Sequence, residues 1–141
     1  MKKATRHIPL SAADERSGKI PIKAAIINEH ASHYLISFRY YNEKNCELRL
    51  LEKNKFRACI DVFKRVTQSK IGSLKEQNID EIRISNAGQY KQLYNKLPHD
   101  DIQILEHKIQ STSRIFYFLS GPVFYITAIK NNHLETGKIK R

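Results

Sequence analysis

The segment that most constrains the fold of this chain is a long apolar run over residues 114–133. Two stretches rich in β-branched and aromatic residues flank the turn-forming sequence Ser-Gly-Pro at 120–122, and charge returns only at the ends of the run. Strands that are apolar on both faces are typical of the centre of a sheet that is covered on both sides. The run therefore predicts a central β-hairpin over 114–129.

A second alternating pattern lies upstream, over residues 34–51. Apolar or aromatic side chains occupy every second position from 34 to 41, a polar turn cluster follows at 42–45, and 46–51 alternates again. This pattern predicts an antiparallel hairpin, with Cys46 on its second strand.

The clearest helix lies between the two predicted hairpins, over residues 55–68. Asn54 is its predicted N-cap. An apolar stripe recurs at a period near 3.6 residues; it consists of Phe56, Cys59, Ile60, Phe63 and Val66. Packing of this stripe on a sheet would present the opposite, cation-rich face of the helix to solvent.

Shorter patterns fill the rest of the chain. The capping-box spacing from Ser73 to Glu76 predicts a short helix, and the apolar spacing within 86–97 predicts another, which Pro98 ends. Residues 79–84 form either a strand or an extended connector, and 102–109 alternate as a strand. This order predicts an α+β fold, with a mostly antiparallel sheet and helices packed on one side.

The length of 141 residues predicts one domain. We expect a flexible arm over 1–20, where no periodicity is present, a single domain over 21–134, and a basic tail over 135–141.

The charge of the chain points to polyanionic partners. Twenty-five Lys and Arg residues against fourteen acids give a net charge of +11. Such an excess favours nucleic acid first and an acidic protein second, over a surface that serves only solubility. The predicted nucleic-acid-binding residues lie on the predicted helix or immediately before it: Lys53, Lys55, Arg57, Lys64 and Arg65.

The sequence predicts a cytoplasmic protein without a membrane span. Its apolar stretches are too short to cross a bilayer, and charges after Met1-Lys2-Lys3 interrupt any signal peptide. Cys46 and Cys59 have no CxxC spacing, so we expect two free thiols in a reducing compartment. No cofactor is expected, and the HxxH spacing at 30–33 lacks a recognisable third ligand, so no metal site is predicted.

Three segments carry a resemblance to a known family. The first is Ile36-Ser-Phe-Arg-Tyr-Tyr41, and the second is the helical segment 55–70. The third is the final hairpin, with Arg114-Ile-Phe-Tyr-Phe, Gly121, Val123-Phe-Tyr-Ile-Thr-Ala-Ile and Asn132-His133. Together they resemble the RelE/ParE-like toxin superfamily of small bacterial and mobile-element proteins, over about residues 34–134.

The resemblance implies a small RelE-like sheet and a basic surface that binds RNA or the ribosome, with an antitoxin as partner. RelE-like toxins cleave mRNA on the ribosome, whereas other members of the wider group poison gyrase or have no demonstrated activity. The chain departs from the RelE pattern because no Arg-Tyr pair follows its last strand and because its N-terminal arm is longer. The resemblance therefore implies binding more directly than cleavage.

If the chain cleaves RNA without a metal, the candidate catalytic residues are Arg114, Lys130, His133 and His107. Such cleavage needs a base for the 2′-hydroxyl, an acid for the leaving oxygen and a cation beside the phosphorane. The alternative is that Arg114 and Lys130 are strand-end gatekeepers and His133 is a loop residue.

Aromatic residues add a further candidate for RNA binding. Several tyrosines could stack on bases, although most occupy periodic positions that suggest the core: Tyr40, Tyr41, Tyr90, Tyr94, Tyr117 and Tyr125. His99-Asp100-Asp101 reads as turn chemistry after Pro98.

Two functions stay open. One is a toxin-like RNA- or ribosome-binding protein, with or without endoribonuclease activity, of a toxin-antitoxin system. The other is a non-enzymatic basic module that binds an acidic protein, such as an antitoxin or a host or phage regulator.

Overall fold

The computed structural model describes residues 32–110 and 112–132 of the chain. A compact unit begins at His33. The predicted arm over 1–20 and the predicted tail over 135–141 lie outside the described residues, as do both boundaries of the predicted domain at 21 and 134.

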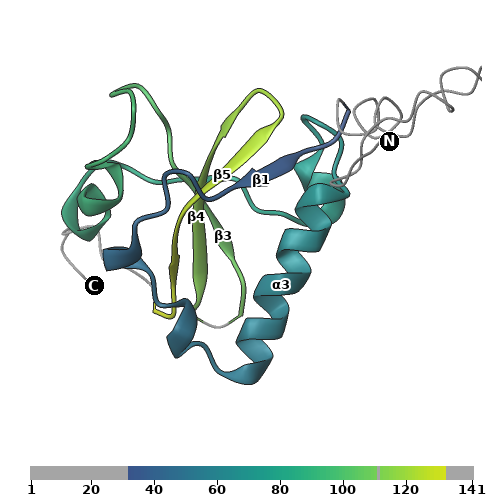
Figure 1. Ribbon diagram of the computed structural model, residues 1–141, viewed down its shortest axis with the longest axis horizontal. Coiled ribbons are helices and arrows are strands. Elements are labelled where there is room, and N and C mark those ends of the chain that lie inside the picture. Colours follow the sequence, from purple (N-terminus) through teal and green to yellow (C-terminus); the bar gives the residue numbers. More distant parts are fainter. Residues whose placement is uncertain (1–31, 111, 133–141) are drawn as a thin grey trace, which may run out of the picture. The chain divides into compact units, whose positions relative to one another are not determined.

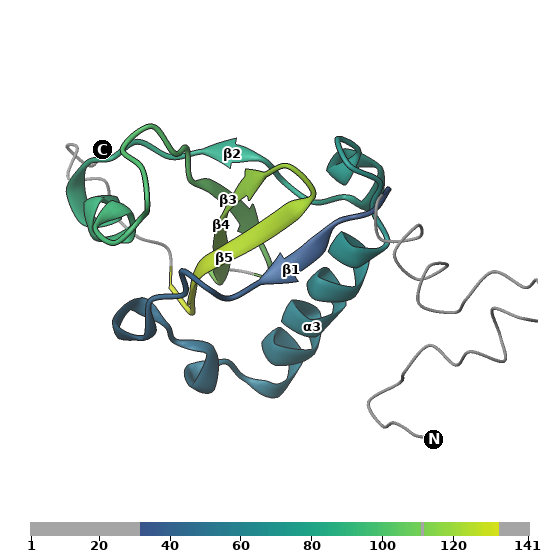
Figure 2. The same ribbon diagram turned by 45° about the horizontal axis from the view of Figure 1, so that its top comes forward.

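The architecture is α+β, as predicted. The strands are β1 (Leu35–Ser37), β2 (Ile82–Arg83), β3 (Leu105–Lys108), β4 (Arg114–Ser120) and β5 (Val123–Lys130). They form one sheet in the order β1-β5-β4-β3-β2; Figure 1 labels all of these strands except β2, and Figure 2 labels all of them. The helical segments are the α-helix α3 (Lys53–Thr67) and the 3-10 helices η1 (Glu43–Asn45), η2 (Leu48–Leu50), η3 (Leu74–Gln77) and η4 (Gly88–Tyr94). The sheet is mixed, because β1 runs parallel to β5 while the other pairs are antiparallel.

The predicted central hairpin is confirmed. β4 and β5 pair from Arg114 opposite Lys130 to Ser120 opposite Val123, and they occupy the middle of the sheet. The turn between them is tight, and Gly121 adopts a left-handed conformation with φ of 57° that favours glycine. Both faces of the hairpin are covered, because its side chains enter two separate apolar clusters.

A β-bulge in β5 decides which side chains enter which cluster. Tyr117 pairs with Ile126 while Phe116 pairs with Ala128, so Thr127 is the extra residue. The side-chain phase of β5 changes there: Ile126 faces the first cluster, Ala128 the second. The buried Thr127 hydroxyl donates to the carbonyl of Phe116 at 3.1 Å, which satisfies a polar group inside the sheet.

The predicted helix is confirmed as α3, although its N-cap and part of its stripe differ. The cap residue is Glu52, without a side-chain bond, instead of Asn54. Cys59, Val62 and Val66 are buried against the sheet. The edge of the predicted stripe faces solvent, because Phe56 and Ile60 are 43% and 47% exposed.

Helical segments cover both faces of the sheet, not one. The first cluster combines Cys59, Val62 and Val66 of α3 with Leu74 of η3. The second joins Tyr90 and Leu93 of η4 to Phe116 and Ala128 of the sheet. Figure 2 shows α3 and η4 on opposite sides of the strands. The prediction of one covered face is wrong because η4, a 3-10 segment in place of the predicted α-helix over 86–97, packs on the second face.

The predicted hairpin over 34–51 is also wrong. Only Leu35–Ser37 form a strand, and it pairs in parallel with β5. The chain then follows the edge of β5, where the Asn42 amide donates to Thr127 O at 2.9 Å and the Glu47 amide to Ile129 O at 2.7 Å. These bonds satisfy β5 carbonyls without a regular strand, so η1 and η2 replace the second strand and Cys46 lies just after η1.

The remaining predictions differ mainly in extent. The strand predicted over 102–109 is present as Leu105–Lys108, and 79–84 contain the short β2. The helix predicted from Ser73 is a single 3-10 turn without a side-chain cap. No helix in the described residues is long and apolar enough to cross a membrane.

Candidate nucleic-acid interface

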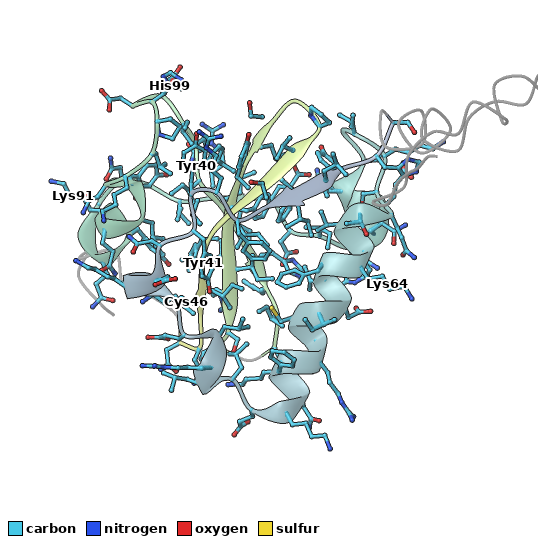
Figure 3. The ribbon with its side chains drawn as sticks, viewed as in Figure 1. Tyr40, Tyr41, Cys46, Lys64, Lys91 and His99 are labelled. Carbon is cyan, nitrogen blue, oxygen red and sulfur yellow. The ribbon has the colours of Figure 1, made fainter. Side chains whose placement is uncertain are left out.

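Three cations form a line along the solvent side of α3. Lys53, Arg57 and Lys64 are exposed, and their spacings of four and seven residues place them on one face of a helix. None of the three forms an ion pair within residues 32–110 and 112–132. Figure 3 shows Lys64 projecting from α3 away from the sheet. We call Lys53, Arg57 and Lys64 the basic ridge.

The other two predicted nucleic-acid-binding cations are occupied by the fold. Arg65 bonds the Asp61 carboxylate at 2.8 Å and also donates to the carbonyls of Gln77 and Asn78. It therefore ties α3 to the end of η3. Lys55, which is half-buried, donates to Asn131 Oδ1 at 3.2 Å and joins the start of α3 to the end of β5.

An apolar strip lies beside the basic ridge. Phe38, just after β1, is 48% exposed and meets the ring of Phe63 edge to face at 5.9 Å. The exposed Phe56 and Ile60 continue the strip along α3. Phe56 and Lys53 also border a hollow of about 750 Å³, which Tyr41 and Leu51 line as well.

The predicted catalytic cations Arg114 and Lys130 lie together but are buried. They face each other across β4 and β5 and are 8% and 7% exposed. Arg114 Nε lies 3.6 Å from the buried Glu106 carboxylate, and Lys130 Nζ lies 3.7 Å from that of Glu47. Both cations therefore have acidic partners inside the fold.

His107 lies on the opposite face of the sheet. It pairs with Ile115, which belongs to the cluster beneath α3, while the adjacent pair is Lys108 with Arg114. Successive side chains of a strand point to opposite faces, so His107 and Arg114 cannot converge on one ligand.

His107 is held as a neutral, structural imidazole. Its Nδ1 accepts the amide of Asp80 at 2.9 Å, as a neutral imidazole does. The Asp80 carboxylate lies 3.3 Å from the same nitrogen and would form an ion pair with it only if the imidazole were protonated. Burial lowers the pKa of His107 below its usual 6.5, and although the Asp80 carboxylate acts against this shift, the Arg65 cation adds to it.

The predicted catalytic set is thus not assembled within the described residues. Arg114 and Lys130 meet, His107 lies on the other face, and His133 lies outside the residues that the structure describes. Residues 32–110 and 112–132 also contain no group of three or more His, Cys, Asp or Glu side chains that could hold a metal ion.

An aromatic cleft lies at the hairpin-turn end of the sheet. Its volume is about 710 Å³, within the range of about 300–1,000 Å³ common for ligand sites. One wall consists of the rings of Tyr40, Phe118 and Tyr125, and the other carries polar groups from 81–83 and 98–103. Figure 3 shows Tyr40 and His99 on the two separate segments that border it.

The aromatic wall is built on β5 and its neighbours. Phe118 and Tyr125 are cross-strand partners whose rings stack at 4.7 Å. Tyr40 lies 5.4 Å from the ring of Tyr125. Its backbone is fixed on both sides, because Ser37 pairs with Tyr125 and the Asn42 amide bonds Thr127.

The polar wall is held by a chain of hydrogen bonds. Gln103 donates through its amide to the carbonyls of Ile84 and Ile104 and accepts from the Arg83 guanidinium at 3.1 Å. The Tyr94 hydroxyl donates to the same Ile84 carbonyl at 2.6 Å. Side chains tied in this way keep their positions when a ligand arrives.

Four of the six tyrosines named as stacking candidates fall into two groups. Tyr90 and Tyr117 are buried in the two clusters, and burial raises the pKa of Tyr90 to about 12 and that of Tyr117 further still. Tyr40 and Tyr125 line the cleft. No pattern in the sequence singled out Arg83 or Gln103. The sequence indicated only a turn at His99-Asp100-Asp101, and His99 and Asp101 of this segment line the cleft.

Comparison of the chain with protein-family models, curated proteins and solved structures finds no match.

Proposed function

We propose that the protein is a RelE-like RNA-binding protein that contacts RNA, free or on the ribosome, through the basic ridge. The observation that carries the proposal is the line of three exposed cations on α3 without acidic partners among the described residues. Lys and Arg side chains in such a row bind phosphates and release condensed counterions. The net charge of +11 draws RNA toward the surface from a distance.

The resemblance to RelE/ParE-like toxins supplies the proposed target, mRNA or the ribosome in the cytoplasm. The α+β fold with a central hairpin and α3 on one face is compatible with this resemblance. The two cysteines, both free, agree with a reducing compartment. We propose binding without cleavage by the predicted set, because Arg114 and Lys130 are paired with acids and His107 faces away from them.

A second candidate function is favoured by the apolar strip beside the ridge. Phe38, Phe56 and Ile60 expose apolar surface next to three cations. Exposed apolar surface with a charged rim is typical of protein interfaces. The alternative is therefore a non-enzymatic module that binds an acidic protein, such as an antitoxin or a regulator.

One experiment on α3 separates the two functions. The ridge variant Lys53→Glu/Arg57→Glu/Lys64→Glu is compared with the strip variant Phe56→Ser/Ile60→Ser by titration of a labelled single-stranded RNA at several salt concentrations. All five side chains are exposed, so we expect both variants to fold. Each substitution should change the free energy of unfolding by no more than about 0.5 kcal/mol.

For RNA binding, the ridge variant is expected to lose at least about tenfold in affinity. Its slope of log K against log salt should fall by roughly 2 units, since three single-strand phosphate contacts are removed. The strip variant should bind as the wild type does. Salt-independent binding, or wild-type affinity in the ridge variant, would contradict RNA binding by α3. The acidic-protein-binding module would be favoured if the wild type binds no RNA and both variants bind an acidic protein partner more weakly than the wild type does.

A further inference from the structure

We propose that the aromatic cleft binds an unpaired nucleobase of the RNA, with Tyr40 as its stacking surface. This inference rests on the proposed RNA binding and adds a second contact with a different chemistry. The net charge and the basic ridge account only for contacts with phosphates, so neither of them implies a base-binding site.

The aromatic wall offers what a base needs for stacking. Tyr40, Phe118 and Tyr125 form a continuous group, with ring centroids 5.8 Å apart for Tyr40–Phe118 and 4.7 Å apart for the stacked Phe118–Tyr125 pair. Phe118 is buried, whereas Tyr40 and Tyr125 remain half-exposed at the cleft. Every base has a flat π face, so such a wall stacks on bases with little sequence preference.

The opposite wall fits the edge of a base better than a phosphate. Glu81 and Asp101 line it, and carboxylates can accept hydrogen bonds from base amino groups while they repel phosphate. Arg83 lines the same wall. Its guanidinium donates to Gln103, and its remaining N–H groups can donate to ring nitrogens or carbonyl oxygens of a base. Donors and acceptors together match the mixed edge of a nucleobase.

A cation-rich hollow next to the cleft suits the phosphate of the same nucleotide. This smaller hollow, of about 330 Å³, shares Tyr40 with the cleft and is lined by three cations, Arg39, Lys44 and Lys96, against one acid, Glu43. All three are exposed, and the Arg39 guanidinium lies 5.7 Å from the centre of the Tyr40 ring. Tyr40 thus separates an aromatic cleft from a cationic hollow, the arrangement that a nucleotide with its base and phosphate requires.

The walls are already in place without a ligand. The bonds around Gln103 hold one wall, and the two β5 anchors of the Tyr40 segment hold the other. Little conformational freedom remains to be lost on binding, which favours affinity.

The test compares Tyr40→Leu with Tyr40→Phe, because both keep an apolar side chain and only Phe keeps the aromatic ring. The probes are a short single-stranded oligouridine and an abasic ribose-phosphate strand of the same length. Tyr40→Leu is expected to bind oligouridine roughly 5- to 100-fold more weakly than the wild type. Tyr40→Phe should bind oligouridine as the wild type does, and all three proteins should bind the abasic strand equally.

Wild-type affinity of Tyr40→Leu for oligouridine would overturn the base site and leave the ridge proposal standing. An equal loss of affinity of Tyr40→Leu for oligouridine and for the abasic strand would also overturn the base site. A wild-type chain that binds neither strand would overturn both proposals.

A second measurement uses the wild type alone, in case Tyr40→Leu does not fold. NMR titration with uridine 5′-monophosphate should shift the ring signals of Tyr40 and Tyr125, and ribose 5-phosphate should not. Absence of any shift at these rings at saturating nucleotide would overturn the base site.

Discussion

The cations at the ends of β4 and β5 differ from those on α3 in what faces them. Arg114 and Lys130 are buried opposite Glu106 and Glu47, while the basic ridge is exposed and has no acidic partner among the described residues. Both groups look alike in the sequence, as basic residues next to apolar patterns. The difference teaches that a cation is available to a ligand only where no distant segment supplies an acid.

The largest expected effect comes from breaking the buried pair. Arg114→Leu removes the cation 3.6 Å from the Glu106 carboxylate, which is 3% exposed. Leaving that carboxylate buried without its cation should lower the free energy of unfolding by about 3–5 kcal/mol. Urea denaturation measures this loss.

Two controls sharpen the comparison. Arg57→Leu on the ridge should change stability by only about 0.5 kcal/mol, because the side chain is exposed and has no ion pair among the described residues. The double variant Arg114→Leu/Glu106→Leu should recover much of the loss, because neither charge remains buried. A single Arg114→Leu variant as stable as the wild type would show that the pair does not hold the fold.

A medium effect on stability is expected at Arg65, a cation bonded within the fold that is next to the exposed Lys64 in the sequence. Arg65 donates to the carbonyls of Gln77 and Asn78, while Lys64 is exposed on the ridge. Arg65→Gln should therefore cost about 1.5–3 kcal/mol of stability, the value of hydrogen bonds from a charged group, and leave RNA affinity unchanged. Lys64→Gln should leave stability unchanged and lower RNA affinity.

The readouts are thermal unfolding and RNA titration of both variants at a temperature where both are folded. Equal effects of the two substitutions on either property would break the distinction between a structural and a ligand-facing cation.

The sequence predicts the parts of this fold whose signal is local and long. The run over 114–129 and the period of α3 each extend over more than ten residues, and both elements are confirmed. The segment 34–51 alternates just as well, yet it follows the edge of β5 through η1 and η2. An alternating pattern indicates only that one side of a segment is apolar. An edge strand followed by tight turns has the same property, so the pattern could not distinguish it from a hairpin.

The site was harder to predict for the same physical reason. Helix periodicity placed five cations on the exposed face of the helix: Lys53, Lys55, Arg57, Lys64 and Arg65. In the structure Lys53, Arg57 and Lys64 are exposed, whereas Lys55 and Arg65 are half-buried. Periodicity could not tell that Arg65 reaches Gln77 or that Glu47 reaches Lys130, because these partners come from segments whose path depends on tertiary packing. The cleft joins Tyr40 to residues 98–103, a contact that no local pattern encodes.

The smallest expected effect concerns His107, which is buried like Arg114 but neutral. Its pKa is lowered in the folded protein, so below pH 6.5 the unfolded chain binds a proton that the folded chain does not. The stability that it contributes is complete above pH 6.5 and is lost as the pH falls from there to the folded pKa, at no more than about 1.4 kcal/mol per pH unit. His107→Gln keeps an acceptor for the Asp80 amide and does not titrate, so its stability should depend less steeply on pH between 6.5 and 5. Urea midpoints across this range measure the slopes, and RNA affinity should be equal in the two proteins at every pH. Equal stability slopes would mean that His107 is protonated in the fold as readily as in the unfolded chain, and that its burial against Asp80 and Arg65 does not exclude the charge.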